Sequence, residues 1–320
     1  YWERRKDILI QRSSLPSMAG FDAAIYANMG EMDNKGLDAN LEYQTRINNK
    51  VGLRLYGNVT YSKNKIVFRD EPDMQYPYQK SEGTRYGEYY GYVADGYFQS
   101  WEEIENSPKQ LRELAPGDIK YKDLNNDNVI DANDQCYLGK SWFPSWSYGM
   151  GFNINYHNFD LALFFQGVSD VSIMANGGSI DTGNGDWGAS GVGIVPFTGM
   201  GLNPSNVITK ALDRWTEDNP RADAWYPRMT ANATTNDNNY VNSTHWLKDG
   251  SYLRLKQASL GYTLENKKLM DKGIEYLYFY LSGQNLLTFS KFKLWDPELG
   301  SNGAKYPLSR MVTLGMRVSF

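Results

Sequence analysis

Hydrophobic and polar residues alternate with a period of two along much of the chain. The last stretch shows this most clearly, with Val312, Leu314 and Met316 on one face and Thr313 and Gly315 on the other. Successive side chains of a β-strand point to opposite faces of the sheet, so this pattern predicts a strand with one apolar face. The pattern predicts eight strands in all, and only one short helix, within 100–114. The other strands are expected around 1–11, 37–44, 51–61, 148–156, 159–166, 252–264 and 277–282.

The predicted strands are joined alternately by short and long connections. The short ones are 48–50, 157–158 and 265–275, and the long ones are 12–34, 65–146, 171–250 and 288–308. Short turns at one end and long loops at the other are typical of outer-membrane β-barrels. Loops of this length are uncommon inside a compact soluble domain. The long connections are therefore predicted to be extracellular loops.

A soluble β-sandwich also shows period-two alternation, so the two architectures have to be separated by composition. The apolar faces carry Tyr and Phe near the strand ends, as the aromatic girdles of a membrane barrel do. The opposite faces are rich in Asp, Asn, Glu, Gln and Arg, as a water-filled interior requires. We therefore predict an all-β fold, a transmembrane antiparallel outer-membrane β-barrel.

Composition narrows the class of protein further. Aromatic residues make up 14% of the 320 residues, and the net charge is −4 without a basic stripe, so nucleic acid is not an expected partner. No apolar run approaches the roughly 18 residues of a membrane-spanning helix. The single cysteine, Cys136, excludes a disulfide within the chain and a cysteine-based zinc site. The chain begins at Tyr1 without a signal peptide, so we expect a mature or internal piece of a longer protein.

Residues for catalysis are not recognisable in the sequence. His157 and His245 have no evident Ser or Cys partner, and Asp296 and Glu298 flank Pro297 as residues that shape a turn do. The sequence therefore predicts a protein that is not an enzyme. Six loop tryptophans fit either stacking on sugar rings or a role in the interfaces and loop cores: Trp142, Trp146, Trp187, Trp215, Trp225 and Trp295.

An acidic stretch resembles a calcium-binding loop. Oxygen donors stand at positions 1, 3, 5, 9 and 12, and the residue at position 7 can offer its backbone carbonyl. Asn128 replaces the usual glycine at position 6, although asparagine tolerates the left-handed conformation. The alternative is an Asp/Asn-rich turn without metal. The predicted Ca²⁺ ligands are Asp123, Asn125, Asp127, Val129, Asp131 and Asp134, and Ile130 is expected to pack inward.

The C-terminal strand ends on an aromatic residue. The pattern Thr313, Gly315, Val318 and Phe320 resembles the β-signal that bacterial outer-membrane proteins present to the barrel-assembly machinery. A final amphipathic strand of this kind can pair with a strand edge of that machinery.

Together these motifs resemble the SusC/RagA-type TonB-dependent outer-membrane transporters of Bacteroidota. The resemblance extends through the whole chain. It rests on NMGEMDNKGLD (28–38), YGYVADGYFQ (90–99), PGDIKYKDLN (116–125), NFDL (158–161), FQG (165–167), DGSYLRLK (249–256), SGQNL (282–286) and YPL (306–308).

The resemblance implies that the chain is the C-terminal part of a plugged, 22-stranded barrel in the bacterial outer membrane. It implies import of oligosaccharides or peptides, a SusD-like surface lipoprotein as a lid, and energy supplied through TonB. The plug and the TonB-contacting region would lie outside this chain. On this interpretation the loops 65–146 and 171–250 would contact the lipoprotein and the substrate.

Two alternative functions stay open at this stage. Eight to ten strands can close alone as a passive porin. A secreted, calcium-bound carbohydrate-binding domain would also be rich in β-strands and loop aromatics.

Overall fold

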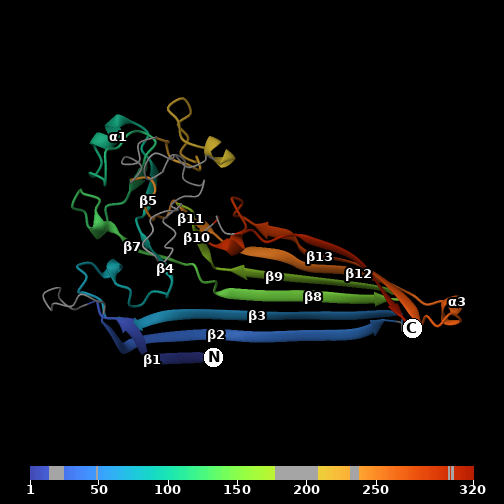
Figure 1. The fold of residues 1–320 in the computed structure, drawn as a ribbon. Coiled ribbons are helices and arrows are strands. Elements are labelled where there is room, and N and C mark those ends of the chain that lie inside the picture. The colour runs from blue at the N-terminus through green and yellow to red at the C-terminus, as the bar shows by residue number, and fades with distance from the viewer. Residues whose placement is uncertain (14–24, 48–49, 177–207, 231–237, 302, 304–305) are drawn as a thin grey trace.

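Eight strands form one antiparallel sheet among the described residues of the computed structural model (Figure 1). The structure describes all residues except 14–24, 48–49, 177–207, 231–237, 302 and 304–305. The strand order is β1-β2-β3-β8-β9-β12-β13-β14. The eight strands predicted by alternation are therefore confirmed. Their bounds are β1 Trp2–Gln11, β2 Tyr26–Ile47, β3 Val51–Phe68, β8 Trp146–Tyr156, β9 Phe159–Ser169, β12 Tyr252–Leu264, β13 Tyr276–Ser290 and β14 Met311–Ser319.

Short connections lie at one end of this sheet, as predicted. β8 turns into β9 through His157 and Asn158, where His157 adopts a left-handed φ of 52° that lets two residues reverse the chain. The link between β12 and β13 contains one helical turn, α3 (Lys267–Met270). The turn between β2 and β3 includes residues 48–49, which lie outside the described residues. The C-terminus lies at the same end as α3 (Figure 1).

The apolar faces of neighbouring strands coincide across the sheet. Leu41, Tyr43 and Leu55 lie on one face of β2 and β3, and the same face continues through Leu163 of β9 to Leu281 of β13. Side chains of directly paired residues lie on the same face, so the register settles this assignment. The opposite face carries polar residues such as Asn40, Arg54, Asn153, Gln166 and Ser282.

Aromatic residues mark both limits of the apolar face. Near the short turns, Tyr156, Phe159, Tyr262 and Phe279 are paired in a row across four strands, and the rings of Phe159 and Tyr262 are 4.7 Å apart. Towards the loops, Tyr61 of β3 faces Trp146 of β8 at 4.6 Å. Tyr and Trp favour such positions at a membrane surface because one end of the ring is polar.

The height of the apolar band matches a membrane. Leu37 and Ile47 are the two ends of the apolar face of β2 and lie ten positions apart. At about 3.4 Å per residue and a tilt of about 45°, this length spans roughly 25 Å, the lipid-facing height of outer-membrane barrels. On the same face of β2, charged residues begin beyond Leu37, first Lys35 and then Asp33. Asp33 pairs with Arg4 of β1 at 2.6 Å.

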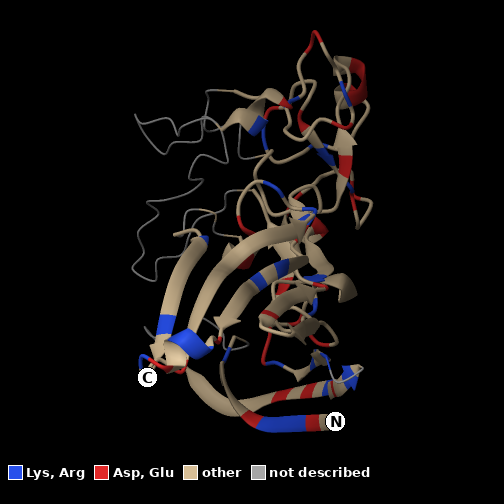
Figure 2. Ribbon diagram, turned by 90° about the vertical axis from the view of Figure 1, so that its right-hand side faces the viewer, with Lys and Arg blue, Asp and Glu red and all other residues tan. Residues whose placement is uncertain are grey.

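The sheet is curved and open at both edges (Figure 2). In the described strand pairing, β1 bonds only to β2 and β14 only to β13. The eight strands therefore do not close into a barrel by themselves, which argues against the eight-stranded porin. Val312, Leu314 and Phe320 are exposed at the β14 edge.

The first predicted loop is too long. Residues 26–34, predicted as loop, belong to β2 and pair with β1 from Tyr26 opposite Gln11 to Asn34 opposite Glu3. This part of the strand lies beyond the apolar band, so both faces mix polar and apolar residues and the alternation is lost. The neighbouring bounds shift less: β3 continues to Phe68, and β13 continues to Ser290.

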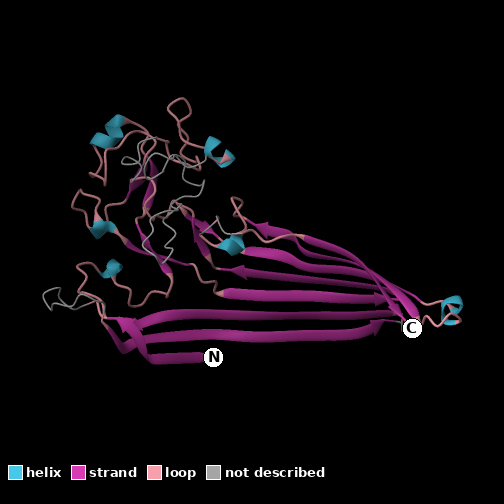
Figure 3. Ribbon diagram, viewed as in Figure 1, coloured by secondary structure: helices cyan, strands magenta, loops and turns pink. Residues whose placement is uncertain are grey.

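Helices are few and lie outside the sheet (Figure 3). The helix predicted within 100–114 is one turn, α1 (Trp101–Glu105). Ser100 caps its N-terminus, because the Ser100 hydroxyl accepts a 3.1 Å hydrogen bond from the Glu103 N–H. No helix among the described residues is long and apolar enough to cross a membrane. The remaining elements are β4 Glu88–Gly91, β5 Ala94–Tyr97, β6 Ile119–Tyr121, β7 Cys136–Ser141, β10 Ser172–Met174, β11 Leu247–Asp249 and 3-10 turns at Pro77–Gln79, Ala132–Asp134, Thr209–Leu212 and Pro297–Leu299.

Candidate functional site

The two longest connections fold together at the loop end of the sheet (Figure 1). We call the described parts of 69–145 and 170–251 the loop unit. Three small antiparallel pairs organise it, β4 with β7, β5 with β6, and β10 with β11. The β10–β11 pair brings the start and the end of the second connection side by side.

Aromatic side chains form the core of the loop unit. Trp246 and Tyr226 are fully buried, with their ring centroids 5.7 Å apart, and Trp225 packs edge-on against both. Rings packed at these distances and angles contribute attraction beyond the area they bury. The other fully or nearly buried members of the cluster are Tyr92, Tyr97, Ile119, Tyr121, Ile130, Met174, Ala211, Trp215 and Ala224.

A buried polar network ties the two connections to each other. Asp118, which is fully buried, accepts a 2.8 Å hydrogen bond from the Asn239 amide and pairs with Arg228 at 2.7 Å. The Asn239 amide oxygen in turn accepts from the Ile119 N–H at 2.9 Å, and the Tyr121 hydroxyl donates to the Asn238 carbonyl at 2.7 Å. Buried polar groups need such partners, so the network fixes how the two long connections pack against each other.

His245 is a structural member of this core. Its Nε2 lies 3.2 Å from the Trp225 carbonyl, which can only accept, so this nitrogen carries the proton. Burial, and repulsion from Lys248, lower the pKa of His245 to about 4. The imidazole is therefore neutral near pH 7 and is enclosed by Tyr97 and Trp246.

The acidic loop folds as a compact turn on the loop unit. Both carboxylate oxygens of Asp123 accept backbone N–H groups, from Asn126 at 2.6 Å and Asn128 at 2.8 Å. Asn128 adopts the left-handed conformation expected at position 6, with φ 65°, and Ile130 is buried as predicted. Asp127 accepts from the Val129 N–H at 2.8 Å.

The other predicted ligands of this loop also serve its own backbone. Asp134 is fully buried and accepts from the Leu124 N–H at 2.7 Å and the Asp131 N–H at 2.9 Å. Asn125 accepts from the Asp127 N–H at 3.1 Å. Across the residues that the structure describes, no three Asp, Glu, His or Cys side chains converge as a metal site would require. Metal binding at this loop stays a prediction.

Asp296 and Glu298 both face one arginine. Arg254 of β12 is 1% exposed and lies 2.5 Å from Asp296 and 3.3 Å from Glu298. Asp296 also accepts from the Glu298 N–H at 3.0 Å and so caps the short 3-10 turn. The two carboxylates therefore hold the β13–β14 connection against the sheet. Cys136 is buried in β7, and burial raises the pKa of its thiol, as expected for a small core residue rather than a nucleophile.

Residues of the predicted assembly signal lie on the exposed β14 edge. Thr313 pairs with Ser282, Val318 pairs with Leu277, and Phe320 is 90% exposed. Gly315 has a packing role besides, because a Cβ at this position would overlap the ring of Tyr280 on β13. Recognition of this strand by assembly machinery stays a prediction.

The tryptophans predicted to lie in loops differ in their surroundings. Trp146 belongs to the aromatic row at the membrane limit, Trp215 is buried in the core, and Trp295 packs on Phe292 at 4.5 Å. Trp142 is exposed, and Trp187 lies outside the described residues. Trp225 lines a cavity.

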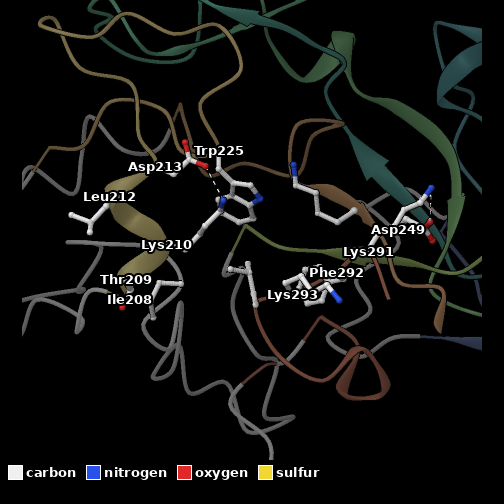
Figure 4. A pocket seen from close by; sticks show the side chains of 12 residues that line it. Ile208, Thr209, Lys210, Leu212, Asp213, Trp225, Asp249, Lys291, Phe292 and Lys293 are labelled. Carbon is white, nitrogen blue, oxygen red and sulfur yellow. Dashed lines mark hydrogen bonds and ion pairs between the residues drawn. The ribbon is translucent and has the colours of Figure 1, made fainter. Parts of the chain in front are cut away.

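That cavity was not predicted from the sequence. It has a volume of about 790 Å³ and lies where the loop unit meets the segment after β13 (Figure 4). Its lysines come from three separate parts of the chain, so no local spacing signals it. They are Lys210, Lys248, Lys291 and Lys293.

Comparison with known proteins identifies relatives over the whole chain. The chain is 27% identical over 348 aligned positions to TonB-dependent receptor P3 of Formosa agariphila, covering 100% of this chain and 32% of that protein. It is 21% identical over 333 positions to TonB-dependent receptor SusC of Bacteroides thetaiotaomicron, covering 99% and 29%. The resemblance to the TonB-dependent receptors is confirmed. No protein-family model matches the chain.

Solved structures show the same fold. The chain superposes on the RagAB peptide importer in its open-open state with a TM-score of 0.69 and 22% identity, covering 100% of this chain and 32% of that one. A second structure, of the RagAB peptide transporter, gives 0.69 and 21%. The predicted outer-membrane barrel fold is thereby confirmed. The chain spans about a third of the length of these relatives.

Proposed function

We propose that the chain forms part of the wall and the outer loops of an importer in the bacterial outer membrane. One observation carries this proposal. The chain forms an open eight-stranded sheet whose apolar face is as tall as the hydrocarbon layer of a membrane, and the whole of this chain aligns with a TonB-dependent receptor. The free edges at β1 and β14 fit a larger barrel, in which every strand has two neighbours.

Within this proposal the cargo is an oligosaccharide or a peptide, and TonB supplies the energy. A related receptor is SusC, and a structurally similar protein is a peptide importer. The loop unit stands beyond the apolar band on the side of the long loops, where cargo would arrive. A SusD-like lipoprotein would cover it and contact 65–146 and 171–250.

Uptake measurements in three isogenic strains test the importer. Labelled oligosaccharides and peptides are supplied to the parent, to a strain lacking this gene, and to a strain lacking TonB. We expect the loss of uptake of the same cargo in both mutants. Uptake that needs this gene but persists without TonB would contradict the importer and favour a porin.

We further propose that the acidic loop at 123–134 binds Ca²⁺. Five Asp or Asn side chains and the left-handed Asn128 support this proposal, because Ca²⁺ takes six to eight oxygen ligands in a sharply turned loop. Calorimetric titration of the full-length protein with Ca²⁺ tests it. Asp127→Ala should weaken binding at least tenfold, whereas Asp95→Ala, at an exposed carboxylate elsewhere in the loop unit, should leave it unchanged. Absence of binding in the unmodified protein would refute the site.

A further inference from the structure

The cavity at the edge of the loop unit combines an apolar wall with a positive rim. The 3-10 turn at Thr209–Leu212 and Trp225 line it together with 291–294 (Figure 4), and Lys248 is also part of its lining. Phe292 and Leu294 pack with Trp225 in a small cluster beside it. We call this cavity the lysine pocket.

Positive charge exceeds negative charge around the lysine pocket. Four lysines and two aspartates line it. Asp213 is already neutralised, since it pairs with Lys210 at 2.7 Å and also contacts Arg221. Asp249 lies 4.0 Å from the exposed Lys291. Lys248 and Lys293 have no carboxylate within ion-pair distance among the described residues, so the rim carries surplus charge.

Lys248 is the most informative of these lysines. Its Nζ donates a 2.6 Å hydrogen bond to the His245 carbonyl and lies 5.2 Å from the centre of the Trp225 ring. Burial, and then repulsion from Lys210, lower its pKa. A half-buried ammonium without a counter-ion is unfavourable unless an anion is supplied.

We propose that the lysine pocket binds a carboxylate or sulfate group of the imported cargo, with Trp225 and Phe292 contacting its apolar body. This inference rests on the proposed import function and narrows the cargo to anionic molecules. Lysine suits the task because its ammonium acts as a point charge and accepts varied anion geometries. An anionic sugar and an acidic peptide both present this chemistry.

Calorimetric titration of the full-length receptor in detergent at low salt tests the pocket. The probes are a galacturonate tetramer with its neutral galactose counterpart, a sulfated galactose tetramer, and a glutamate-containing hexapeptide with its glutamine counterpart. The variant Lys291→Gln/Lys293→Gln removes two exposed charges of the rim and leaves Lys248 in place. The control, Lys268→Gln/Lys272→Gln, makes the same charge change at the opposite end of the sheet.

We expect at least one anionic probe to bind more tightly than its neutral counterpart. The rim variant should weaken that binding by about three- to tenfold, and the control should not. Raising the salt concentration should reduce the difference in affinity between the rim variant and the control. Binding by the sugar alone or by the peptide alone would identify the source of the anion.

The proposal is overturned if no anionic probe outbinds its neutral counterpart, or if the rim variant binds as the control does. Its failure can be told apart from failure of the import function. TonB-dependent uptake without lysine-sensitive anion binding would refute the pocket alone. Lysine-sensitive binding of a probe that enters cells equally well without TonB would refute the import mechanism alone.

Discussion

At the scale of single residues, glycines on the polar face make room for aromatic rings of the neighbouring strand. A Cβ on Gly151 would overlap Tyr56, and one on Gly315 would overlap Tyr280. The ring then covers backbone that glycine leaves bare, a device known to stabilise sheets. Gly315 therefore has a packing reason in addition to its place in the terminal strand pattern.

Gly315→Ala should destabilise the barrel by about 1–3 kcal/mol because the ring of Tyr280 is displaced. Urea unfolding of the full-length protein in detergent, followed by gel mobility, measures the change. Gly52→Ala is the control, because its Cβ would meet Asn155 at an ordinary 3.6 Å. If packing is the cause, Tyr280→Ser should recover part of the loss in the double variant. Strict additivity would point to the assembly signal instead.

His245 should make the loop unit less stable in acid. Its pKa is about 4 in the folded protein against 6.5 unfolded, so below about pH 6.5 the unfolded chain takes up a proton that the folded chain does not. Stability should therefore fall between about pH 6.5 and 4, by about 3 kcal/mol in all. His245→Gln should remove this part of the slope in tryptophan-monitored unfolding. Parallel pH profiles of the two proteins would contradict the assignment, since the other groups titrate in both.

At the scale of elements, the strands were predictable and the loop unit was not. Alternation depends on neighbours two positions apart, and the membrane enforces it between Leu37 and Ile47. Where the strand leaves the apolar band, as in 26–34, the pattern disappears and the prediction failed. The loop unit depends on contacts such as Asp118 with Asn239, 121 positions apart, which no local pattern reveals. The lysine pocket is likewise lined by residues from distant parts of the chain, so no local pattern predicts it.

Asp118→Asn should loosen the loop unit without unfolding the sheet. The change leaves Arg228 without its carboxylate, and loss of one partner of a buried pair costs about 3–5 kcal/mol. Hydrogen exchange of the full-length protein should show faster exchange in β5, β6 and β11, with β12 and β13 unchanged. Asp95→Asn is the matched control. Asp95 is half exposed, and its ion pair with Lys122 is long, at 3.8 Å. Equal exchange in both variants would contradict the role of the network.

For the whole molecule, the two faces and the two edges of the sheet indicate a position in the wall of a membrane barrel. One face is apolar over a membrane height, the other is polar, and the edges at β1 and β14 are free for further strands. A soluble domain would cover the apolar face with its own chain. Among the described residues, Leu41, Leu281 and Leu314 stay exposed instead. The proposed import and the proposed anion binding both depend on this arrangement.

Spin labelling of the full-length protein in lipid vesicles shows whether the apolar face lies in the membrane. Single cysteines are placed in a Cys136→Ser background at Leu41, Leu281 and Leu314, and at their neighbours Asn40, Ser282 and Thr313. We predict that the three leucine positions are relaxed by oxygen, which dissolves in lipid, and protected from a water-soluble nickel complex, with the reverse at the neighbours. Equal access of the nickel complex to both sets would show that the apolar face is not in the membrane.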